Sequence, residues 1–260
     1  MSLPAFLHPD LRDISRGDTV VLAGAEGRHA VTVKRLGVGE KVLLVHAPGE
    51  LDRASEGLFV EAIVTETRGK DELIATAEHV GKTDEPNPRV TVVQAIPKSE
   101  RSELAIDLAT QAGADEFIAW QADRCIAKWD AKKAPKALGK WQSQAQAAAK
   151  QSRRTRVPFV HGPLTTPQLV QHLNDRATAL IYVLHEDASD SIKDVAVIKD
   201  SAEATDLIVL IGPEGGIGDE ELETLKSAGA HAIKLGPEVL RTASAAMVAL
   251  AAIGVRTNRW

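Results

Sequence analysis

Two loops in the C-terminal third of the chain have residue types that suit ligand binding through the backbone. They are LIVLIGPEGGIGDEEL (207–222) and AIKLGPEVLRTASAAMVAL (232–250). Each starts as an apolar, strand-like run, breaks at Gly212-Pro213 or Gly236-Pro237, and continues as a helical pattern. Glycine lets a ligand approach the backbone closely, and proline fixes the turn while removing a donor. Because such loops meet at the carboxyl edge of a parallel sheet, the pair predicts a ligand site there.

The residues around these glycines exclude several other kinds of site. A nucleoside triphosphate loop needs Lys-Ser/Thr after its glycines, but Gly215-Gly216 is followed by Ile217-Gly218. A dinucleotide fingerprint would follow the first α/β strand, which instead ends in AIPKSE. No Gly-x-Ser-x-Gly elbow occurs, and the eight histidines and single cysteine, Cys125, show no metal-ligand spacing. A lone GPEGG is also compatible with a structural turn, and the second loop favours ligand binding.

Short strands fill the first part of the chain. Strand-like runs occur at 19–23, 41–46, 57–65 and 73–79, separated by glycine-containing and charged turns. This spacing predicts a small β-barrel over residues 1–80. Within it, GRHAVTVKRL (27–36) has a helical pattern and a basic patch. The polar segment GKTDEPNPR (81–89) contains two prolines and is expected to be a linker.

From residue 90 the pattern alternates between strands and helices. Strands are expected at 90–96, 116–120, 179–186, 206–212 and 232–236, and helices at 99–113, 137–152, 166–176, 219–229 and 243–255. In the first helix, Leu104, Ile106, Leu108 and Ala109 are expected to form the buried face. This alternation is typical of an α/β domain with a mainly parallel sheet, here over residues 90–260.

The charge distribution points to an anionic partner, although the net charge is −5. From Arg124 to Arg156 there are ten Lys/Arg and a single acid, Asp130. A basic band on an acidic body attracts an anionic polymer, and Trp129 and Trp141 within this band suit stacking on bases. A solvated helix surface remains the alternative interpretation of this charge run.

The composition favours a cytoplasmic protein. A single cysteine permits no internal disulfide, and the first residues lack the basic-then-apolar pattern of a secretory signal. The most apolar stretch, 243–255, is too short to cross a bilayer and is expected to be a buried helix. We therefore expect neither a membrane nor a metal partner.

In combination, IGPEGGIGDEEL, LGPEVLRTASAA, RRTRVP, ADRC and GRHAVTVKRL resemble the RsmE family of ribosomal RNA methyltransferases, which belongs to the SPOUT class. The resemblance covers nearly the whole chain. It implies an N-terminal PUA-like, RNA-binding β-barrel and a C-terminal α/β domain with a trefoil knot. It further implies a homodimer that uses S-adenosyl-L-methionine and forms N3-methyluridine in the decoding region of 16S rRNA, on the small ribosomal subunit.

The resemblance also implies site residues. Arg241 is expected to be catalytic, because a guanidinium stabilises the negative charge on O2 or O4 of a uracil that has lost its N3 proton. Glu214 is a candidate general base, with capping of the following helix as its alternative role. Cofactor contacts are expected from Leu184, His185, Glu186, Ile211, Gly212, Pro213, Glu214, Gly215, Gly216, Leu235, Gly236, Pro237, Leu240, Thr242 and Ala245. RNA contacts are expected from Arg28, His29, Arg35, Lys98, Arg124, Arg153, Arg154 and Arg156.

The sequence departs from the family pattern at two places. A segment expected as Glu-Gln-Ser/Cys-Gly-Arg reads Lys150-Gln151-Ser152-Arg153-Arg154, which affects the expected RNA contacts. The LRTET-like motif reads Leu240-Arg241-Thr242-Ala243-Ser244 and lacks an acidic residue. Three alternatives stay open: a SPOUT methyltransferase acting on a ribose 2′-hydroxyl or another base, a non-catalytic RNA-binding assembly factor, and an Arg241 that only pairs with a carboxylate near a helix start.

Overall fold

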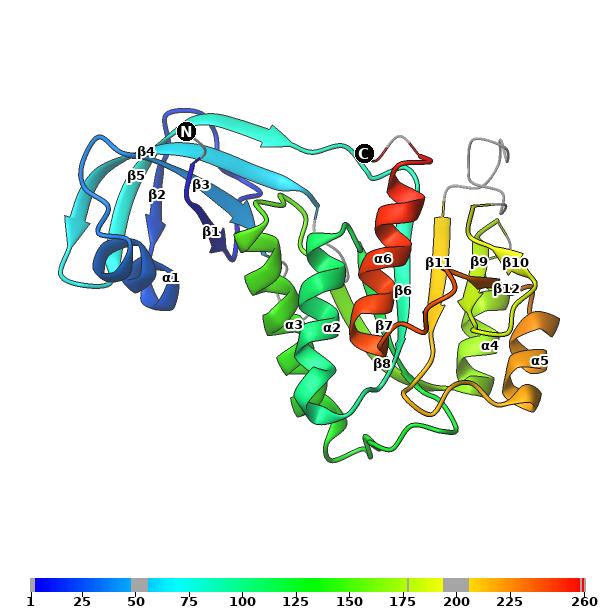
Figure 1. The fold of residues 1–260 in the computed structure, drawn as a ribbon. Helices are drawn as coiled ribbons and strands as arrows, with labels where there is room; N and C mark the ends of the chain where they lie inside the picture. The colour runs from blue at the N-terminus through cyan, green and yellow to red at the C-terminus, as the bar shows by residue number, and fades with distance from the viewer. Residues whose placement is uncertain (1–2, 48–55, 177, 194–205, 258, 260) are drawn as a thin grey trace. The chain divides into compact units, whose positions relative to one another are not determined.

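The computed structural model describes residues 3–47, 56–176, 178–193, 206–257 and 259 (Figure 1). The chain divides into two compact units. The N-terminal unit comprises Met1–Glu85 together with Ala149–Val157, and the C-terminal unit comprises Pro86–Ala148 and Pro158–Trp260. Each unit has its own buried apolar core.

A five-stranded sheet forms the N-terminal unit. Its strands are β1 (Ala5–His8), β2 (Thr19–Leu22), β3 (Lys41–His46), β4 (Leu58–Arg68) and β5 (Glu72–Lys82), in the order β1-β3-β4-β5-β2. Only the β1–β3 pair is parallel among its described pairs. The expected helix at 27–36 begins earlier, as α1 (Gly24–Arg28) followed by a turn of π-helix, η1 (His29–Val33). The sequence pattern did not predict β1.

A seven-stranded parallel sheet forms the C-terminal unit, which confirms the expected α/β class. Its strands are β6 (Arg89–Ala95), β7 (Glu116–Gln121), β8 (Phe159–Thr165), β9 (Leu180–Leu184), β10 (Asp190–Ser191), β11 (Asp206–Ile211) and β12 (His231–Lys234), in the order β10-β12-β9-β11-β6-β7-β8. The central strands β6 and β11 are almost wholly buried. Their continuous apolar runs are therefore those of strands covered on both faces.

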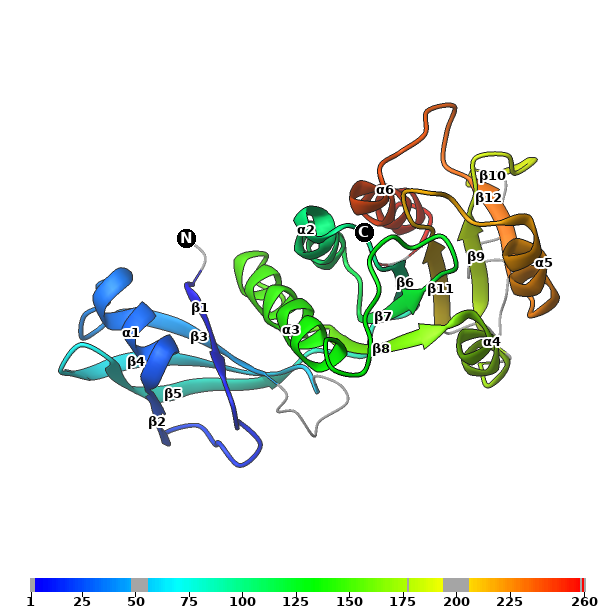
Figure 2. The same cartoon turned by 90° about the horizontal axis from the view of Figure 1, so that it is seen from below.

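Helices cover both faces of this sheet (Figure 2). They are α2 (Ser99–Gln111), α3 (Ala134–Gln151), α4 (Thr166–Asn174), α5 (Asp219–Ser227) and α6 (Thr242–Gly254). Helices α2 and α6 lie side by side on one face, and α4 lies on the other face beside α5. No helix of the described residues is both long enough and apolar enough to cross a bilayer.

Two expectations about these elements are wrong. Leu104 is 48% exposed, because the buried face of α2 is formed instead by Ala105, Ile106 and Ala109, at helical spacing. Strand β8 was missed because its sequence, FVHGPLT, contains Gly-Pro, which weakens a strand pattern. Gly162 (φ +111°) is required there, since a Cβ would lie 2.6 Å from the carbonyl oxygen of Ala119.

The boundary between the units also differs from the expected linker at 81–89. Strand β5 continues to Lys82 and β6 begins at Arg89, so only residues 83–88 lie between the strands. Residues 149–157 belong to the N-terminal unit, where the guanidinium of Arg156 donates to the carbonyl oxygens of Thr83 (2.8 Å), Asp84 (3.2 Å) and Glu56 (3.2 Å). The RRTRVP segment is therefore attached to the N-terminal unit.

Candidate active site

A cavity of about 610 Å³ lies in the C-terminal unit, at the carboxyl ends of β9, β11 and β12. The loops that follow these strands line it, together with the first turns of α2 and α6. All the expected cofactor contacts line this one cavity: Leu184, His185, Glu186, Ile211, Gly212, Pro213, Glu214, Gly215, Gly216, Leu235, Gly236, Pro237, Leu240, Thr242 and Ala245. The fold thus brings both Gly-Pro loops to one place, as their positions after parallel strands predict.

The first loop is compact, and its glycines explain why. A Cβ on Gly212 would lie 2.9 Å from the side chain of Ile217, which folds back over the loop. Gly216 has φ +70°, and its N–H donates to the carbonyl oxygen of Pro213 at 3.0 Å. A Cβ on Gly215 would lie 3.3 Å from Arg124. These positions therefore need glycine for close packing and for a left-handed backbone.

A buried hydroxyl group connects the two loops. Thr242 Oγ1 donates to the carbonyl oxygen of Gly212 at 2.7 Å, and Gln94 Nε2 donates to Thr242 Oγ1 at 3.0 Å. Gln94 is 1% exposed, and its Oε1 has no hydrogen-bond partner among the described residues. The sequence pattern did not single out Gln94, although a polar residue within the apolar strand VTVVQAI was the available indication.

Glu214 caps a helix other than the one expected. Its Oε1 accepts the main-chain N–H of Lys98, the residue that precedes α2, at 3.1 Å. The following helix, α5, instead has Gly218 as its N-cap and carries acidic residues in its own first turn. A carboxylate at a helix N-terminus satisfies a free N–H and interacts favourably with the helix dipole.

Arg241 precedes the first residue of α6, and its exposed side chain lines the cavity. Its carbonyl oxygen accepts the N–H groups of Ser244 (2.9 Å) and Ala245 (3.1 Å). No carboxylate in the described part of the chain forms an ion pair with it. The alternative in which Arg241 only pairs with a nearby carboxylate is therefore not supported.

The expected RNA contacts fall into two groups. In the C-terminal unit, Arg124 lines the cavity and Lys98 is exposed at the start of α2. In the N-terminal unit, Arg28, Arg35 and Arg153 are exposed, and Arg154 is half-buried. RNA contact by these exposed cations therefore stays a prediction, made for each unit separately.

Two of the expected RNA contacts have other roles in the structure. Arg156 uses its guanidinium for backbone carbonyls and for the carboxylate of Glu85 at 3.0 Å. His29 Nδ1 lies 3.4 Å from Lys150 Nζ. The pKa of His29 is lowered, mainly by burial of the imidazole and secondly by the positive charge of Lys150. The imidazole is therefore neutral at pH 7 and adds no positive charge to the expected basic patch.

The two tryptophans of the basic segment are not free to stack on bases. Trp141 is 1% exposed, and its Nε1 donates to Ser102 Oγ at 2.6 Å. Trp129 packs edge-on against it, with ring centroids 4.9 Å apart. Both rings therefore belong to the core of the C-terminal unit rather than to a nucleic-acid surface.

Other residues also line the cavity. Arg124, expected as an RNA contact, approaches from the loop after β7, and Glu238 and Val239 lie between the expected contacts Pro237 and Leu240. The residues not predicted are Arg101, Asp187, Ile217, Asp219, Ile233 and Lys234. Arg101 comes from the first turn of α2, a position that follows from the sheet order and not from any motif. Among the described residues, no group of three or more His, Cys, Asp or Glu could bind a metal ion.

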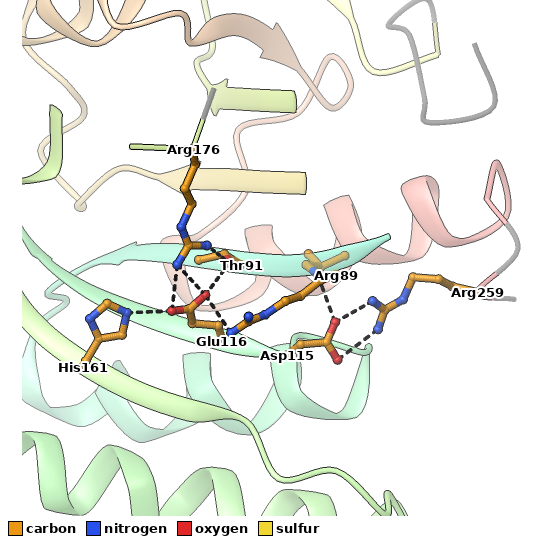
Figure 3. Close-up of polar contacts among 8 residues, drawn as sticks. Arg89, Thr91, Asp115, Glu116, His161, Arg176 and Arg259 are labelled. Carbon is orange, nitrogen blue, oxygen red and sulfur yellow. Dashed lines mark hydrogen bonds and ion pairs between the residues drawn. The ribbon is translucent and has the colours of Figure 1, made fainter. Parts of the chain in front are cut away.

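The amino-terminal edge of the same sheet carries a different polar cluster (Figure 3). Glu116 is 4% exposed and accepts hydrogen bonds from Arg176 (3.0 Å), Arg89 (3.2 Å) and Thr91 (2.8 Å), with His161 Nε2 at 2.9 Å. Burial alone would raise the pKa of Glu116, but His161 and the two arginines hold it far below the ordinary carboxyl value. Arg89, Thr91 and Arg176 all donate to this buried carboxylate from within the fold, which indicates a structural cluster.

The comparisons with known proteins identify the family of the chain. Residues 84–254 match the RNA methyltransferase domain family. The chain is 48% identical to the ribosomal RNA small subunit methyltransferase E of Mycobacterium bovis, over 94% of this chain and 89% of that protein. It is 28% identical to the protein of the same name from Bacillus subtilis, over 97% of this chain and 96% of that one.

Solved structures share the fold. One is a ribosomal RNA small subunit methyltransferase E from Neisseria gonorrhoeae, crystallised with S-adenosyl methionine, which matches with a TM-score of 0.81. The two sequences are 24% identical, and the match covers 98% of each chain. From the family match and the 48% identity, the chain belongs to the RNA methyltransferase family, among the ribosomal RNA small subunit methyltransferases E.

Proposed function

We propose that this protein uses S-adenosyl-L-methionine to methylate N3 of a specific uridine in the decoding region of 16S rRNA, on the small ribosomal subunit. One observation carries the proposal: both Gly-Pro loops and Arg241 line a single cavity at the carboxyl ends of three parallel strands. The name of the Mycobacterium bovis relative supports a small-subunit RNA substrate. The Neisseria gonorrhoeae structure supports the cofactor, since that protein holds it on the same fold.

The cavity suits a nucleoside-sized cofactor. Its volume of about 610 Å³ lies within the range of small-molecule sites. Gly212, Gly215 and Gly216 carry no side chains of their own, so a ligand can approach the main chain of this loop, and free backbone groups there would contact an adenine edge. When bound, S-adenosyl-L-methionine supplies the methyl group that is transferred.

Arg241 would stabilise charge in the reaction. Loss of the N3 proton spreads negative charge over O2 and O4 of the uracil, and a guanidinium beside either oxygen lowers the energy of that state. Arginine suits this role because it stays protonated at any relevant pH. Glu214 is a weaker choice for the general base than the sequence indicated, because its carboxylate accepts the N–H of Lys98.

The remaining expectations belong to the same proposal. The N-terminal unit would act as a PUA-like RNA-binding barrel over residues 1–80, and the 90–260 domain would carry a trefoil knot. Exposed cations such as Arg28, Arg35 and Arg153 would contact phosphates, which gives affinity that falls with salt. The enzyme would act as a homodimer in the cytoplasm, without a metal.

A product assay tests the proposal. Small ribosomal subunits that lack the modification are incubated with protein and labelled S-adenosyl-L-methionine, and the RNA is digested to nucleosides for mass spectrometry. We expect N3-methyluridine from the wild type and a loss of about 10²–10³-fold in rate for Arg241→Ala. Lys226→Ala, an exposed change on α5, is the matched control and should keep full activity.

The other products separate the alternatives. A 2′-O-methyl nucleoside would keep the methyl transfer but contradict the proposed target atom. Binding of RNA without any methyl transfer would contradict the enzyme and favour an assembly factor. Full activity of Arg241→Ala would contradict the role given to that guanidinium alone.

A further inference from the structure

Glu221 is a buried carboxylate in the first turn of α5, directly after the first Gly-Pro loop. It is 4% exposed, whereas the preceding acid of the same turn, Glu220, is exposed. Glu221 Oε1 accepts two hydrogen bonds, from Thr166 Oγ1 at 2.5 Å and from the main-chain N–H of Asp123 at 3.1 Å. A carboxylate in the first turn of a helix can interact with the helix dipole while it stays in water. Glu221 is instead buried inside the C-terminal unit, and burial of a carboxylate is tolerated where hydrogen bonds compensate for the lost water, as these two do.

The hydrogen bond to Asp123 fixes the loop that carries Arg124. The Arg124 side chain lies along the first Gly-Pro loop, since a Cβ on Gly215 would lie 3.3 Å from Arg124 Cβ, and one on Gly218 would lie 3.6 Å from Arg124 Nε. Arg124 Nη1 donates to the carbonyl oxygen of Gly215 at 3.3 Å. The Arg124 side chain therefore packs against the first Gly-Pro loop. This packing depends on the position of the main chain at the neighbouring residue, Asp123.

The guanidinium of Arg124 keeps most of its donors available at the cavity. The side chain is exposed and lines the cavity, and the contact with Gly215 uses one of its five N–H groups. No described carboxylate pairs with it. A fixed cation without a protein counter-ion, beside a methyl-donor loop, is suited to an anionic ligand such as a phosphodiester.

We propose that Glu221 is a positioning residue: through the main chain of Asp123 it holds Arg124 across the first Gly-Pro loop, so that the guanidinium meets a phosphate of the RNA substrate. The inference rests on the proposed function for the identity of the substrate. Glu221 does not touch the substrate in this scheme. Its role is to accept a hydrogen bond, so the negative charge itself is not required.

Five single variants of the whole 260-residue chain test this role, Arg124→Ala among them. Glu221→Leu removes the acceptor, and Glu221→Gln keeps an oxygen for Asp123 and Thr166. Glu221→Asp shortens the side chain and replaces Glu221→Leu if that variant does not fold. Thr166→Val is the matched control, because it removes the other bond to Glu221 and leaves Trp120 Nε1 without its partner, but spares the bond to Asp123.

The readouts are the Kd for a labelled 16S rRNA transcript, the Kd for S-adenosyl-L-methionine by calorimetry, and the melting temperature. We expect Glu221→Leu and Arg124→Ala each to weaken RNA binding about tenfold, with the cofactor Kd unchanged within twofold. Glu221→Gln should bind RNA like the wild type. Thr166→Val should lower the melting temperature without changing either Kd.

A double-mutant cycle decides whether Glu221 acts through Arg124. If it does, Glu221→Leu adds nothing to the RNA Kd once Arg124 is alanine. Additive losses, an RNA effect of Thr166→Val, or a change confined to the cofactor Kd would each overturn the proposal. These binding measurements need no methyl transfer, so a wild type without N3-methyluridine product would refute the proposed function separately.

Discussion

At the scale of single residues, Thr242 shows how one hydroxyl group holds the cavity together. It donates to the carbonyl oxygen of Gly212 and accepts from Gln94, which joins the second Gly-Pro loop to the first and to β6. We predict that Thr242→Val raises the Kd for S-adenosyl-L-methionine about tenfold, because the carbonyl and the amide both lose a partner in a buried place. Isothermal titration calorimetry measures this Kd directly.

Thr242→Ser is the control, since serine keeps the hydroxyl and loses only a methyl group. Its Kd should stay within about twofold of the wild type. Equal losses in Thr242→Ser and Thr242→Val would mean that the methyl contact matters and the hydrogen bonds do not.

Most of the residues that the sequence predicted for the cavity lie in or next to the two loops that follow apolar strands and contain Gly-Pro. Such loops have local signatures, because the turn itself demands those residue types. Gln94 and Glu221 have no such signature. Their importance comes from partners that are distant in sequence, Thr242 and Asp123, and these contacts exist only once the sheet order is known.

One departure from the family pattern has a local explanation. Arg153 stands where the resemblance gives glycine, and its φ is +58°, in the left-handed region. Lys150, which stands where glutamate is expected, pairs with Glu26 at 2.6 Å in the same unit. The left-handed backbone at Arg153 is the conformation that glycine adopts readily, which fits the glycine of the family pattern at this position.

At the scale of the elements, Glu116 joins the amino-terminal ends of three neighbouring strands to the end of α4 (Figure 3). We predict that Glu116→Gln lowers the free energy of unfolding by about 2 kcal/mol at pH 7, because Arg89 and Arg176 lose their carboxylate. The arginines are partly exposed, at 38% and 22%, so the loss is smaller than for a fully buried pair. Urea unfolding followed by tryptophan fluorescence measures it.

The fluorescence reports on the correct unit, since the sequence of the N-terminal unit contains no tryptophan and Trp120, Trp129 and Trp141 lie in the C-terminal unit. Glu223→Gln, which breaks an exposed pair with Lys226, is the control and should change the free energy of unfolding by less than about 0.5 kcal/mol. A Glu116→Gln variant as stable as the wild type would show that the cluster contributes no net stability.

The same cluster predicts a pH dependence. The pKa of Glu116 is lowered from an ordinary value of 4.5, so its stabilising contribution is complete above that pH and is lost as the pH falls below it. The difference in unfolding free energy between wild type and Glu116→Gln should therefore be constant from pH 7 to about pH 5 and shrink below pH 4.5. A difference that grew on acidification would contradict the assigned direction of the shift.

The elements themselves were predictable to different degrees. Strands β6 and β11 were found within one residue at each end, because a strand buried on both faces has a continuous apolar run. Strands β1, β8 and β10 were missed, since they are short or contain Gly-Pro and their pairing depends on neighbours. Leu104 was misplaced because periodicity alone does not show which side of α2 meets α6.

At the scale of the whole molecule, the net charge was a poor indicator of an anionic partner, and the local charge of the basic segment was a better one. The basic segment 124–156 spans both units, with its end at 149–157 counted in the N-terminal unit. Some of its members, Lys150 and Arg156, are used to attach that end. Some cations of this segment therefore have a structural role, and others are exposed and expected to contact RNA. A count of Lys and Arg in the sequence does not distinguish the two groups.

The last prediction concerns the interface of the proposed homodimer. Leu104 of α2, Val248 of α6 and Val255, which follows the last residue of α6, are 48%, 37% and 69% exposed, and the two helices lie side by side. An apolar surface on adjacent helices is typical of a subunit interface. Sedimentation equilibrium should give twice the chain mass of 27.8 kDa for the wild type and a single chain mass for Leu104→Asp/Val248→Asp, because charges would be buried without partners. Val38→Asp, which introduces the same residue at a 69% exposed valine of the N-terminal unit, should leave the dimer intact. Persistence of the dimer in the double variant would place its interface elsewhere.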